Sequence, residues 1–178
     1  MNRKDRGILI GMSFGDGHIT DKGKFVMIHC KAQKQYAEHK AELIHSIFGG
    51  YKPNVKDINN NGYPGVRYAK QHKYFRLIRK RLYVNRKKVF SVNILKHLTV
   101  HGLALWWMDD GSVYMKRHNG KVHAREGILS TYVSIEENKL IADRIEELTS
   151  VRHIPVHNKG KFRLRFNTGM LKIFLPIM

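Results

Sequence analysis

The alternation of apolar and polar residues changes its period several times along the chain, and the same order of changes occurs twice. Residues 4–15 form an apolar stretch of helical length that ends in Asp-Gly, and residues 99–109 form another with the same ending. The aspartates that follow these stretches, Asp16 and Asp110, are 94 residues apart. Glycine directly after an apolar stretch is typical of a helix C-terminus. The sequence therefore predicts two helices that each present one carboxylate at the C-terminal end.

After each of these helices the period alternates, becomes helical, and alternates again. In the first half this pattern predicts a hairpin over 18–34, a helix over 34–48, a hairpin over 51–70 and a basic helix over 72–83. In the second half it predicts hairpins over 112–131 and 154–166, a helix that starts at the capping box Ser134–Glu137 and a last apolar segment over 171–177. The turns are marked by residues 21–23, 59–62, 118–121 and 158–160. The chain therefore has an α+β pattern with two halves, which we expect to span residues 1–97 and 98–178.

Two glycines lie inside the first predicted helix, Gly11 and Gly15, four residues apart. A glycine inside a helix costs about 1 kcal/mol relative to alanine. Small residues at this spacing let a second helix approach closely. We therefore expect the first apolar helix to pack tightly against another helix.

The predicted strands carry apolar residues on one face and basic or polar residues on the other. In residues 24–31 we assign Val26, Ile28 and Cys30 to one face and Met27, His29 and Lys31 to the other. In the last strand Phe162, Leu164 and Phe166 alternate with Lys161, Arg163 and Arg165. The further outward-facing candidates are Arg67, Lys116, His118, His123 and Arg125. An antiparallel sheet with one buried and one basic face suits the groove of a nucleic-acid duplex.

Composition supports a nucleic-acid partner. The chain has 178 residues, 33 Lys+Arg against 14 Asp+Glu, and a formal net charge of +19. The excess lies mostly in residues 1–97, with 21 basic and 6 acidic residues, against 12 and 8 in residues 98–178. A polyanion is the expected partner of such a chain. A structural RNA-binding protein would also explain this charge, but it would leave the two Asp-Gly endings unexplained.

Other features limit the compartment and the kinds of site. Hydrophobic residues make up 42% of the chain, which is enough for a buried core. No apolar run approaches the roughly 18–20 residues of a membrane span. The N-terminal segment is a poor signal peptide, and the single cysteine, Cys30, excludes an intrachain disulfide and a cysteine zinc site. We expect an intracellular protein without a membrane partner.

The two aspartates are the candidates for chemistry. A helix C-terminus carries about half a negative charge, so a carboxylate there is unfavourable. If the halves are related by a two-fold axis, Asp16 and Asp110 lie side by side and repel each other further. A divalent metal with oxygen ligands would compensate them, and the last helical carbonyls could add ligands. Metal-bound water could then attack a phosphodiester. We expect Asp109 to point elsewhere and to make a cap or a polar contact.

The segments Leu9–Gly17 and Leu103–Gly111 resemble the two signature motifs of LAGLIDADG homing endonucleases, in the branch that carries both motifs in one chain. The segments Gln35–Lys40 and Phe174–Pro176 are similar to that branch too. The resemblance implies two pseudo-symmetric αββαββα halves, with the motif helices packed at the centre and two antiparallel sheets forming a DNA-binding saddle. It implies a monomer that cuts both strands of a long double-stranded DNA site with Mg²⁺ or Mn²⁺ and leaves 3′ overhangs. A bacterial or phage-infected cytoplasm, or an organelle, would be the setting.

The resemblance also implies roles for single residues. Asp16 and Asp110 match the metal-binding acids, and the backbone carbonyls of Gly15 and Asp109 match further ligands. Lys70 matches a lysine near the scissile phosphates, and Gln33 matches a glutamine there. The second half has no lysine at the strand end that corresponds to Lys70, where Asn167, Thr131 or Arg165 are the alternatives. A maturase that binds intron RNA, or a non-cleaving DNA-binding or RNA-binding protein on the same scaffold, is the alternative function.

Overall fold

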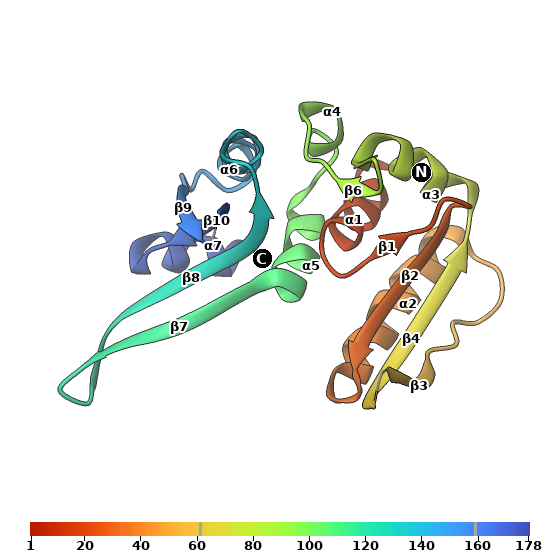
Figure 1. The fold of residues 1–178 in the computed structure, drawn as a ribbon, viewed down its shortest axis with the longest axis horizontal. Helices are drawn as coiled ribbons and strands as arrows, with labels where there is room; N and C mark the ends of the chain where they lie inside the picture. Colours follow the sequence, from red (N-terminus) through yellow and green to blue (C-terminus); the bar gives the residue numbers. More distant parts are fainter. Residues whose placement is uncertain (61, 159) are drawn as a thin grey trace.

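A computed structural model of the protein describes residues 1–60, 62–158 and 160–178, and it runs twice through the same order of elements (Figure 1). The first run comprises α1 (Arg3–Phe14), β1 (His18–Ile19), β2 (Lys24–Cys30), the 3-10 turn η1 (Lys31–Gln33), α2 (Lys34–Phe48), β3 (Lys56–Asn60), β4 (Tyr63–Gln71) and α3 (Lys73–Leu82). The second comprises α5 (Val100–Asp110), β7 (Gly111–His118), β8 (Lys121–Val133), α6 (Ile135–Thr149), β9 (Ile154–Asn158), β10 (Lys161–Phe166) and α7 (Thr168–Ile177). The predicted αββαββα order is confirmed in both halves. The connection holds β5 (Tyr83–Val84), β6 (Lys87–Lys88) and α4 (Val92–Leu95), which the sequence pattern did not predict.

Each half contains a four-stranded antiparallel sheet with an equivalent strand order. The orders are β1-β2-β4-β3 and β7-β8-β10-β9. Helix α2 packs on β2 and β4, and α6 packs on β8, β9 and β10. Figure 1 shows the two sheets diverging from α1 and α5, which lie between them. No helix in the part of the chain that the structure describes is long and apolar enough to cross a membrane.

The backbones of α1 and α5 are in direct contact. A side chain on Gly11 would overlap the carbonyl of Gly102, and one on Gly102 would overlap the carbonyl of Gly7. The packing reason predicted for Gly11 is therefore confirmed. Gly15 lies against a side chain of the other half, that of Asp109, and not against its backbone. This close packing brings the C-terminal ends of the two helices together.

Aromatic side chains fill the space beside the two central helices. Phe14 makes edge contacts with Phe90 and Trp106, at ring-centroid distances of 4.9 and 5.0 Å. Trp106 is 1% exposed, and Trp107 packs edge-on against Phe166. Trp106 is therefore a core residue, and Trp107 is partly buried against the core.

The strand faces are as predicted along β10 of the second half and reversed along β2 of the first. Leu164 and Phe166 are buried, and the alternating Arg163 and Arg165 lie on the other face of β10. On β2, however, the face of Phe25, Met27 and His29 is buried, whereas Ile28 and Cys30 are exposed. The assignment of His29 to the outward face is therefore wrong, and the exposed face of β2 is largely apolar.

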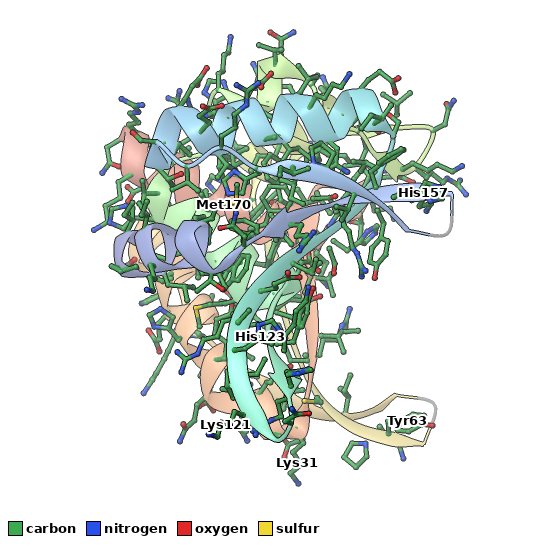
Figure 2. The ribbon with its side chains drawn as sticks, turned by 90° about the vertical axis from the view of Figure 1, so that its left-hand side faces the viewer. Lys31, Tyr63, Lys121, His123, His157 and Met170 are labelled. Carbon is green, nitrogen blue, oxygen red and sulfur yellow. The ribbon has the colours of Figure 1, made fainter. Side chains whose placement is uncertain are left out.

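The two leading hairpins differ in length. β1 has 2 residues and β2 has 7, whereas β7 has 8 and β8 has 13. The tip of the longer hairpin has Asn119 and Gly120 at φ 48° and 75°, as a tight two-residue turn requires. In Figure 2 its tip, at Lys121, lies at the same end of the molecule as Lys31 and Tyr63 of the first half. The predicted turns over 59–62 and 158–160 each include a residue, 61 and 159, that lies outside the described residues.

Candidate active site

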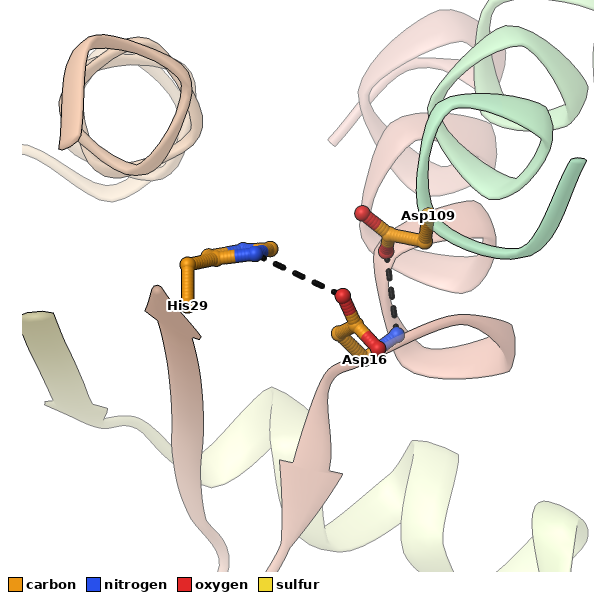
Figure 3. Close-up of side chains that lie close together, drawn as sticks. All are labelled: Asp16, His29 and Asp109. Atoms are coloured by element: carbon orange, nitrogen blue, oxygen red, sulfur yellow. Dashed lines mark hydrogen bonds and ion pairs between the residues drawn. The ribbon is translucent and has the colours of Figure 1, made fainter. Parts of the chain in front are cut away.

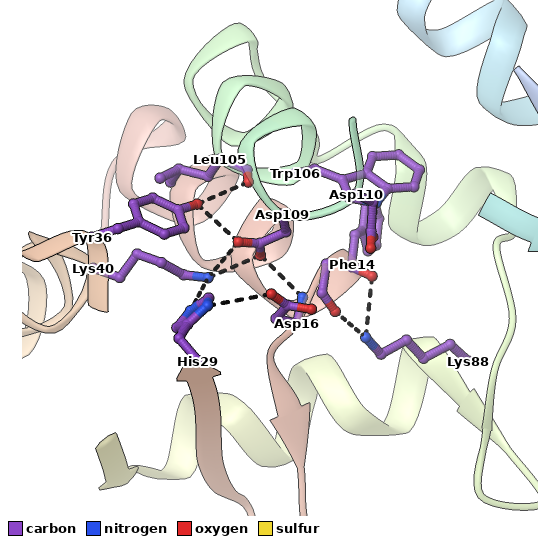
Figure 4. Close-up of polar contacts among 11 residues, drawn as sticks. Phe14, Asp16, His29, Tyr36, Lys40, Lys88, Leu105, Trp106, Asp109 and Asp110 are labelled. Carbon is purple, nitrogen blue, oxygen red and sulfur yellow. Dashed lines mark hydrogen bonds and ion pairs between the residues drawn. The ribbon is translucent and has the colours of Figure 1, made fainter. Parts of the chain in front are cut away.

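The two aspartates predicted from the repeat lie at the paired helix ends. Asp110 is the last residue of α5, and Asp16 follows the C-cap of α1 (Figure 4). The Asp110 carboxylate accepts a hydrogen bond from the Trp106 indole at 3.0 Å. The Asp16 carboxylate lies 3.4 Å from Nδ1 of His29, and its side chain is 42% exposed. Asp16 therefore faces solvent, with one side against the first half.

Burial and mutual repulsion disturb both carboxyl groups. Burial raises the pKa of Asp110 to about 6, and the charge of Asp16 adds to this effect. Burial also raises the pKa of Asp16, and the charge of Asp109 raises it further. The nearby cations oppose these shifts without cancelling them. The two helix ends therefore favour an additional positive charge.

The Asp109 carboxylate is a buried connection between the halves, in accordance with the polar contact expected of it. It accepts hydrogen bonds from Lys40 Nζ at 2.8 and 2.9 Å, from the Tyr36 hydroxyl at 2.9 Å and from the backbone N–H of Asp16 at 3.0 Å. The Lys40 and Asp109 side chains are both 0% exposed. Because Asp109 belongs to α5 and its partners to the first half, this contact fixes the position of the Asp16 loop.

Asp16, His29 and Asp109 come close enough together to resemble a metal site (Figure 3). One ligand atom from each lies within 4.8 Å of the others. Both oxygens of Asp109 are already used by the donors described above, however, and His29 is buried with Nε2 3.4 Å from Lys40 Nζ. This triad is a polar support beneath Asp16, in which Asp109 accepts a hydrogen bond from the Asp16 backbone and His29 lies 3.4 Å from the Asp16 carboxylate.

The lysine beside the carboxylates is Lys88, not Lys70. Lys88 Nζ donates to the carbonyl oxygens of Phe14 at 3.1 Å and Gly15 at 2.5 Å. Burial lowers its pKa to about 8, although the charges of Asp110 and Asp16 raise it. Lys70 instead lies across from the buried Phe25 and donates to the Gly49 carbonyl at 3.0 Å. The structure therefore does not bring Lys70 to the aspartates.

Sequence reasoning missed Lys88 because it lies in the connecting segment, where no periodic pattern assigns a direction to a side chain. In the sequence, Lys88 stands out only as the end of the basic run Arg86-Lys-Lys88. The helix α3 also carries a run of basic residues, so this feature does not distinguish Lys88 from them. What places Lys88 is the short β5–β6 ladder, which returns the chain to the end of α1. Gln33 is exposed on η1, where its side-chain oxygen lies 3.5 Å from the Cys30 thiol.

An open cleft of about 760 Å³ runs from Asp110 toward the second sheet, and Asp16 does not line it. Gly15, Lys88 and Asp110 line it, together with Thr131 and Lys161. Of the alternatives for a partner in the second half, Thr131 alone lines this cleft, and its hydroxyl donates to the Phe162 carbonyl. Asn167 caps α7, and Arg165 binds Glu126.

The predicted outward-facing cations are divided between the two faces of the sheets. Arg67 and Lys31 are exposed, and Lys116, Arg163 and Arg165 share the face of the second sheet that α6 and α7 leave uncovered. His123 and Arg125 line a groove against α7, so they lie on the helix side of β8. His118 and Lys161 are exposed at strand ends. The expected basic face is therefore narrower than the sequence pattern indicated.

The donors that meet at the helix ends fit a hard divalent cation. They are the carboxylates of Asp16 and Asp110 and nearby backbone carbonyls such as that of Gly15, and oxygen ligands of this kind suit Mg²⁺ and Mn²⁺. The Gly15 carbonyl already attracts one cation, the ammonium of Lys88. The fold is repeated in two halves, a carboxylate lies at the end of each central helix, and one sheet face is basic. These features define a class of proteins that carry two equivalent motifs and bind nucleic acid.

Comparison with known proteins identifies the family. The profile of the LAGLIDADG DNA endonuclease family matches residues 6–174, and the chain belongs to that family. A probable intron-encoded DNA endonuclease 3 of Mycosarcoma maydis is 30% identical over 86 residues, which cover 48% of this chain and 59% of that protein. Protein RecA of Mycobacterium shimoidei is 29% identical over 115 residues, which cover 61% of this chain and 26% of that protein. The match thus spans less than two thirds of either relative.

Solved structures share the fold at low sequence identity. The homing endonuclease I-WcaI bound to its DNA recognition sequence superposes with a TM-score of 0.80 at 20% identity, covering 99% of this chain and 81% of that one. The meganuclease I-SmaMI bound to an uncleavable DNA gives a TM-score of 0.63 at 10% identity, covering 99% and 82%. I-DmoI in complex with DNA and Ca gives 0.56 at 12% identity, covering 98% and 89%.

Proposed function

We propose that the protein is a site-specific DNA endonuclease that makes a double-strand break with 3′ overhangs. The observation that carries the proposal is the pair of carboxylates, Asp16 and Asp110, at the joined ends of two equivalent halves. Each half also carries a four-stranded sheet, and two equivalent halves suit the two strands of a duplex. Family membership and the DNA-bound neighbours support the same substrate. Because both motif helices lie in one chain, a monomer would suffice.

The residues that would hold a divalent metal are Asp16, Asp110 and the backbone carbonyls of Gly15 and Asp109. Such a metal, Mg²⁺ or Mn²⁺, would supply an activated water and would stabilise the leaving oxygen. The raised pKa values of both aspartates support this proposal, because a cation would relieve their repulsion. Trp106 holds Asp110 in one orientation through its indole N–H.

Lys88 would take the role that the family resemblance implies for Lys70. Its ammonium donates a hydrogen bond to the Gly15 carbonyl and is attracted by the charge of Asp110. It would therefore contact a phosphate that is bound across the two helix ends. With a pKa lowered to about 8, it can donate a proton near neutral pH. Among the described residues, no second lysine makes an equivalent contact beside Asp110. Lys88 would therefore have no counterpart in the second half.

The exposed strand faces would grip the duplex on both sides of the carboxylates. Lys31 of the first half and Lys121 at the tip of the β7–β8 hairpin lie at the same end of the molecule (Figure 2). The longer β7–β8 hairpin reaches further than its equivalent in the first half. We therefore expect the second half to contact more base pairs than the first.

The experiment is cleavage of a DNA library that contains long randomised sites, with Mg²⁺ or with EDTA. The proposal predicts sequence-specific double-strand breaks with Mg²⁺ and none with EDTA. Breaks that persist in EDTA would contradict the metal site, and the absence of any specific break with Mg²⁺ would contradict the endonuclease proposal.

A further inference from the structure

Glu126 is a buried acid on the otherwise basic outward face of the second sheet. The residue is 6% exposed, whereas the side chains of Lys116 and Arg165 that cover it are 43% and 42% exposed. Leu129 and Leu164, which pair in the register of β8 and β10, face the helices, so Glu126 points to the uncovered side. Folding therefore places an acid beneath two solvent-facing cations.

The Glu126 carboxylate joins side chains from three neighbouring strands. Its Oε1 accepts from Lys116 Nζ at 2.6 Å on β7 and from Arg165 Nη2 on β10. Its Oε2 accepts from Arg165 Nε at 3.1 Å and from the Tyr114 hydroxyl at 2.5 Å. We call these four residues the Glu126 cluster. All four contacts orient donors around one carboxylate.

This arrangement fixes which donors Arg165 can offer to a ligand. A guanidinium carries five N–H donors in a rigid fork. Glu126 uses Nε–H and one N–H of Nη2. No other residue that the structure describes hydrogen-bonds to the far edge, which consists of Nη1 and the second N–H of Nη2. Two parallel donors at that edge match O6 and N7 of guanine in the major groove, the commonest specific arginine contact with DNA.

The same carboxylate makes the cluster poor at attracting phosphate. Lys116 and Arg165 bring two positive charges, and Glu126 neutralises one of them at contact distance. A phosphate at this position would also be repelled by the carboxylate. The geometry therefore favours a neutral acceptor, a base edge, over the sugar-phosphate backbone.

We propose that the Glu126 cluster is a base-reading unit, in which Glu126 positions Arg165 to recognise one guanine of the DNA site. The inference rests on the proposed DNA substrate and adds a specificity-determining residue to it. Glu126 acts through Arg165 and is a positioning residue. Tyr114 and Lys116 hold the carboxylate in place from the neighbouring strand.

The experiment is a binding selection on a randomised DNA library in EDTA, so that cleavage plays no part in it. The wild type is compared with Glu126→Ala, Glu126→Gln and Arg165→Lys. The matched control is Glu147→Ala, which frees Arg144 from a 2.7 Å ion pair on the outer helix α6. Circular dichroism checks that each variant is folded, and Arg165→Lys tests the proposal without removing the acid.

We expect Glu126→Ala and Arg165→Lys to lose the preference for guanine at the same base pair, by roughly ten- to a hundredfold. Glu126→Ala should also bind random DNA more tightly, with a log–log salt slope steeper by about one, because a cation is released to phosphate. Glu126→Gln should keep part of the preference, and Glu147→Ala should keep all of it.

Weaker binding to all sequences alike, with the base preferences intact, would overturn the proposal and would make the cluster a structural or phosphate-binding one. A wild type without base preference would overturn it too. Failure of the endonuclease proposal would look different, as specific binding in EDTA without cleavage in Mg²⁺.

Discussion

Replacing Lys40 with methionine would remove one partner of an ion pair that is completely buried between the two halves. Lys40 donates to both oxygens of Asp109, at 2.8 and 2.9 Å, and neither side chain is exposed. Methionine has a similar length and flexibility, so little cavity is expected. The change therefore isolates the loss of charge and of hydrogen bonds.

The expected loss of unfolding free energy is about 3 kcal/mol. Removing one partner of a buried ion pair typically costs about 3–5 kcal/mol, because the other charge stays buried without compensation. The lower end applies here, since Asp109 keeps its hydrogen bonds from Tyr36 and the Asp16 backbone. Asp109→Asn should cost a similar amount, and the double variant should cost roughly 1–3 kcal/mol less than the sum.

Urea denaturation at pH 7, followed by the fluorescence of the interface tryptophans, measures these differences. The control is Lys34→Met, which breaks a 3.2 Å ion pair whose side chains are 40% and 55% exposed, and which should cost less than about 1 kcal/mol. Equal losses for Lys40→Met and Lys34→Met, or strictly additive losses in the double variant, would refute the reasoning.

Three further predictions concern other parts of the fold. Burial lowers the pKa of His153 to about 4 and leaves both ring nitrogens without a partner. As the pH falls, His153 is therefore protonated in the unfolded state before it is protonated in the folded state. The free energy of unfolding should fall by about 2 kcal/mol from pH 7 to pH 5, and by less in His153→Phe. Gly11→Ala should lower the free energy of unfolding by at least about 1–3 kcal/mol, because its Cβ meets the Gly102 backbone, while Gly169→Ala, whose Cβ would make only an ordinary contact with the Asn167 side chain at 3.4 Å, should not. Lys88→Met should slow cleavage roughly a hundredfold with binding retained, whereas Lys70→Met should cleave like the wild type.

Much of the fold could be predicted because its signals are local. The capping box at Ser134 and Glu137, the Asn-Gly turn at 119–120 and the alternation along β10 all appear in the structure as predicted. The pairing of Asp16 with Asp110 followed from the repeat, since equivalent positions in two halves meet near their common axis. Local periodicity needs no knowledge of distant partners.

The errors arose where distant residues decide the outcome. Strand β2 is apolar on both faces, so its pattern could not say which face is buried, and a wrong choice reverses every side chain. The contacts of His29 with Lys40 and Asp16, from a helix and a loop, make its burial possible. Lys88 reaches the site through a two-residue strand, which is too short to produce a pattern. The paired acids were therefore predictable, and the groups around them were not.

The most direct test of the two-carboxylate site is DNA cleavage by Asp16→Asn and Asp110→Asn, each measured together with binding to the same target. Asparagine keeps the shape of the side chain but removes the charge that a metal would need. Asp143→Asn, on the exposed side of α6, is the control. The account predicts that either site variant binds the target and no longer makes double-strand breaks in Mg²⁺, while the control cuts normally. Double-strand cleavage at the normal rate by either site variant would contradict it.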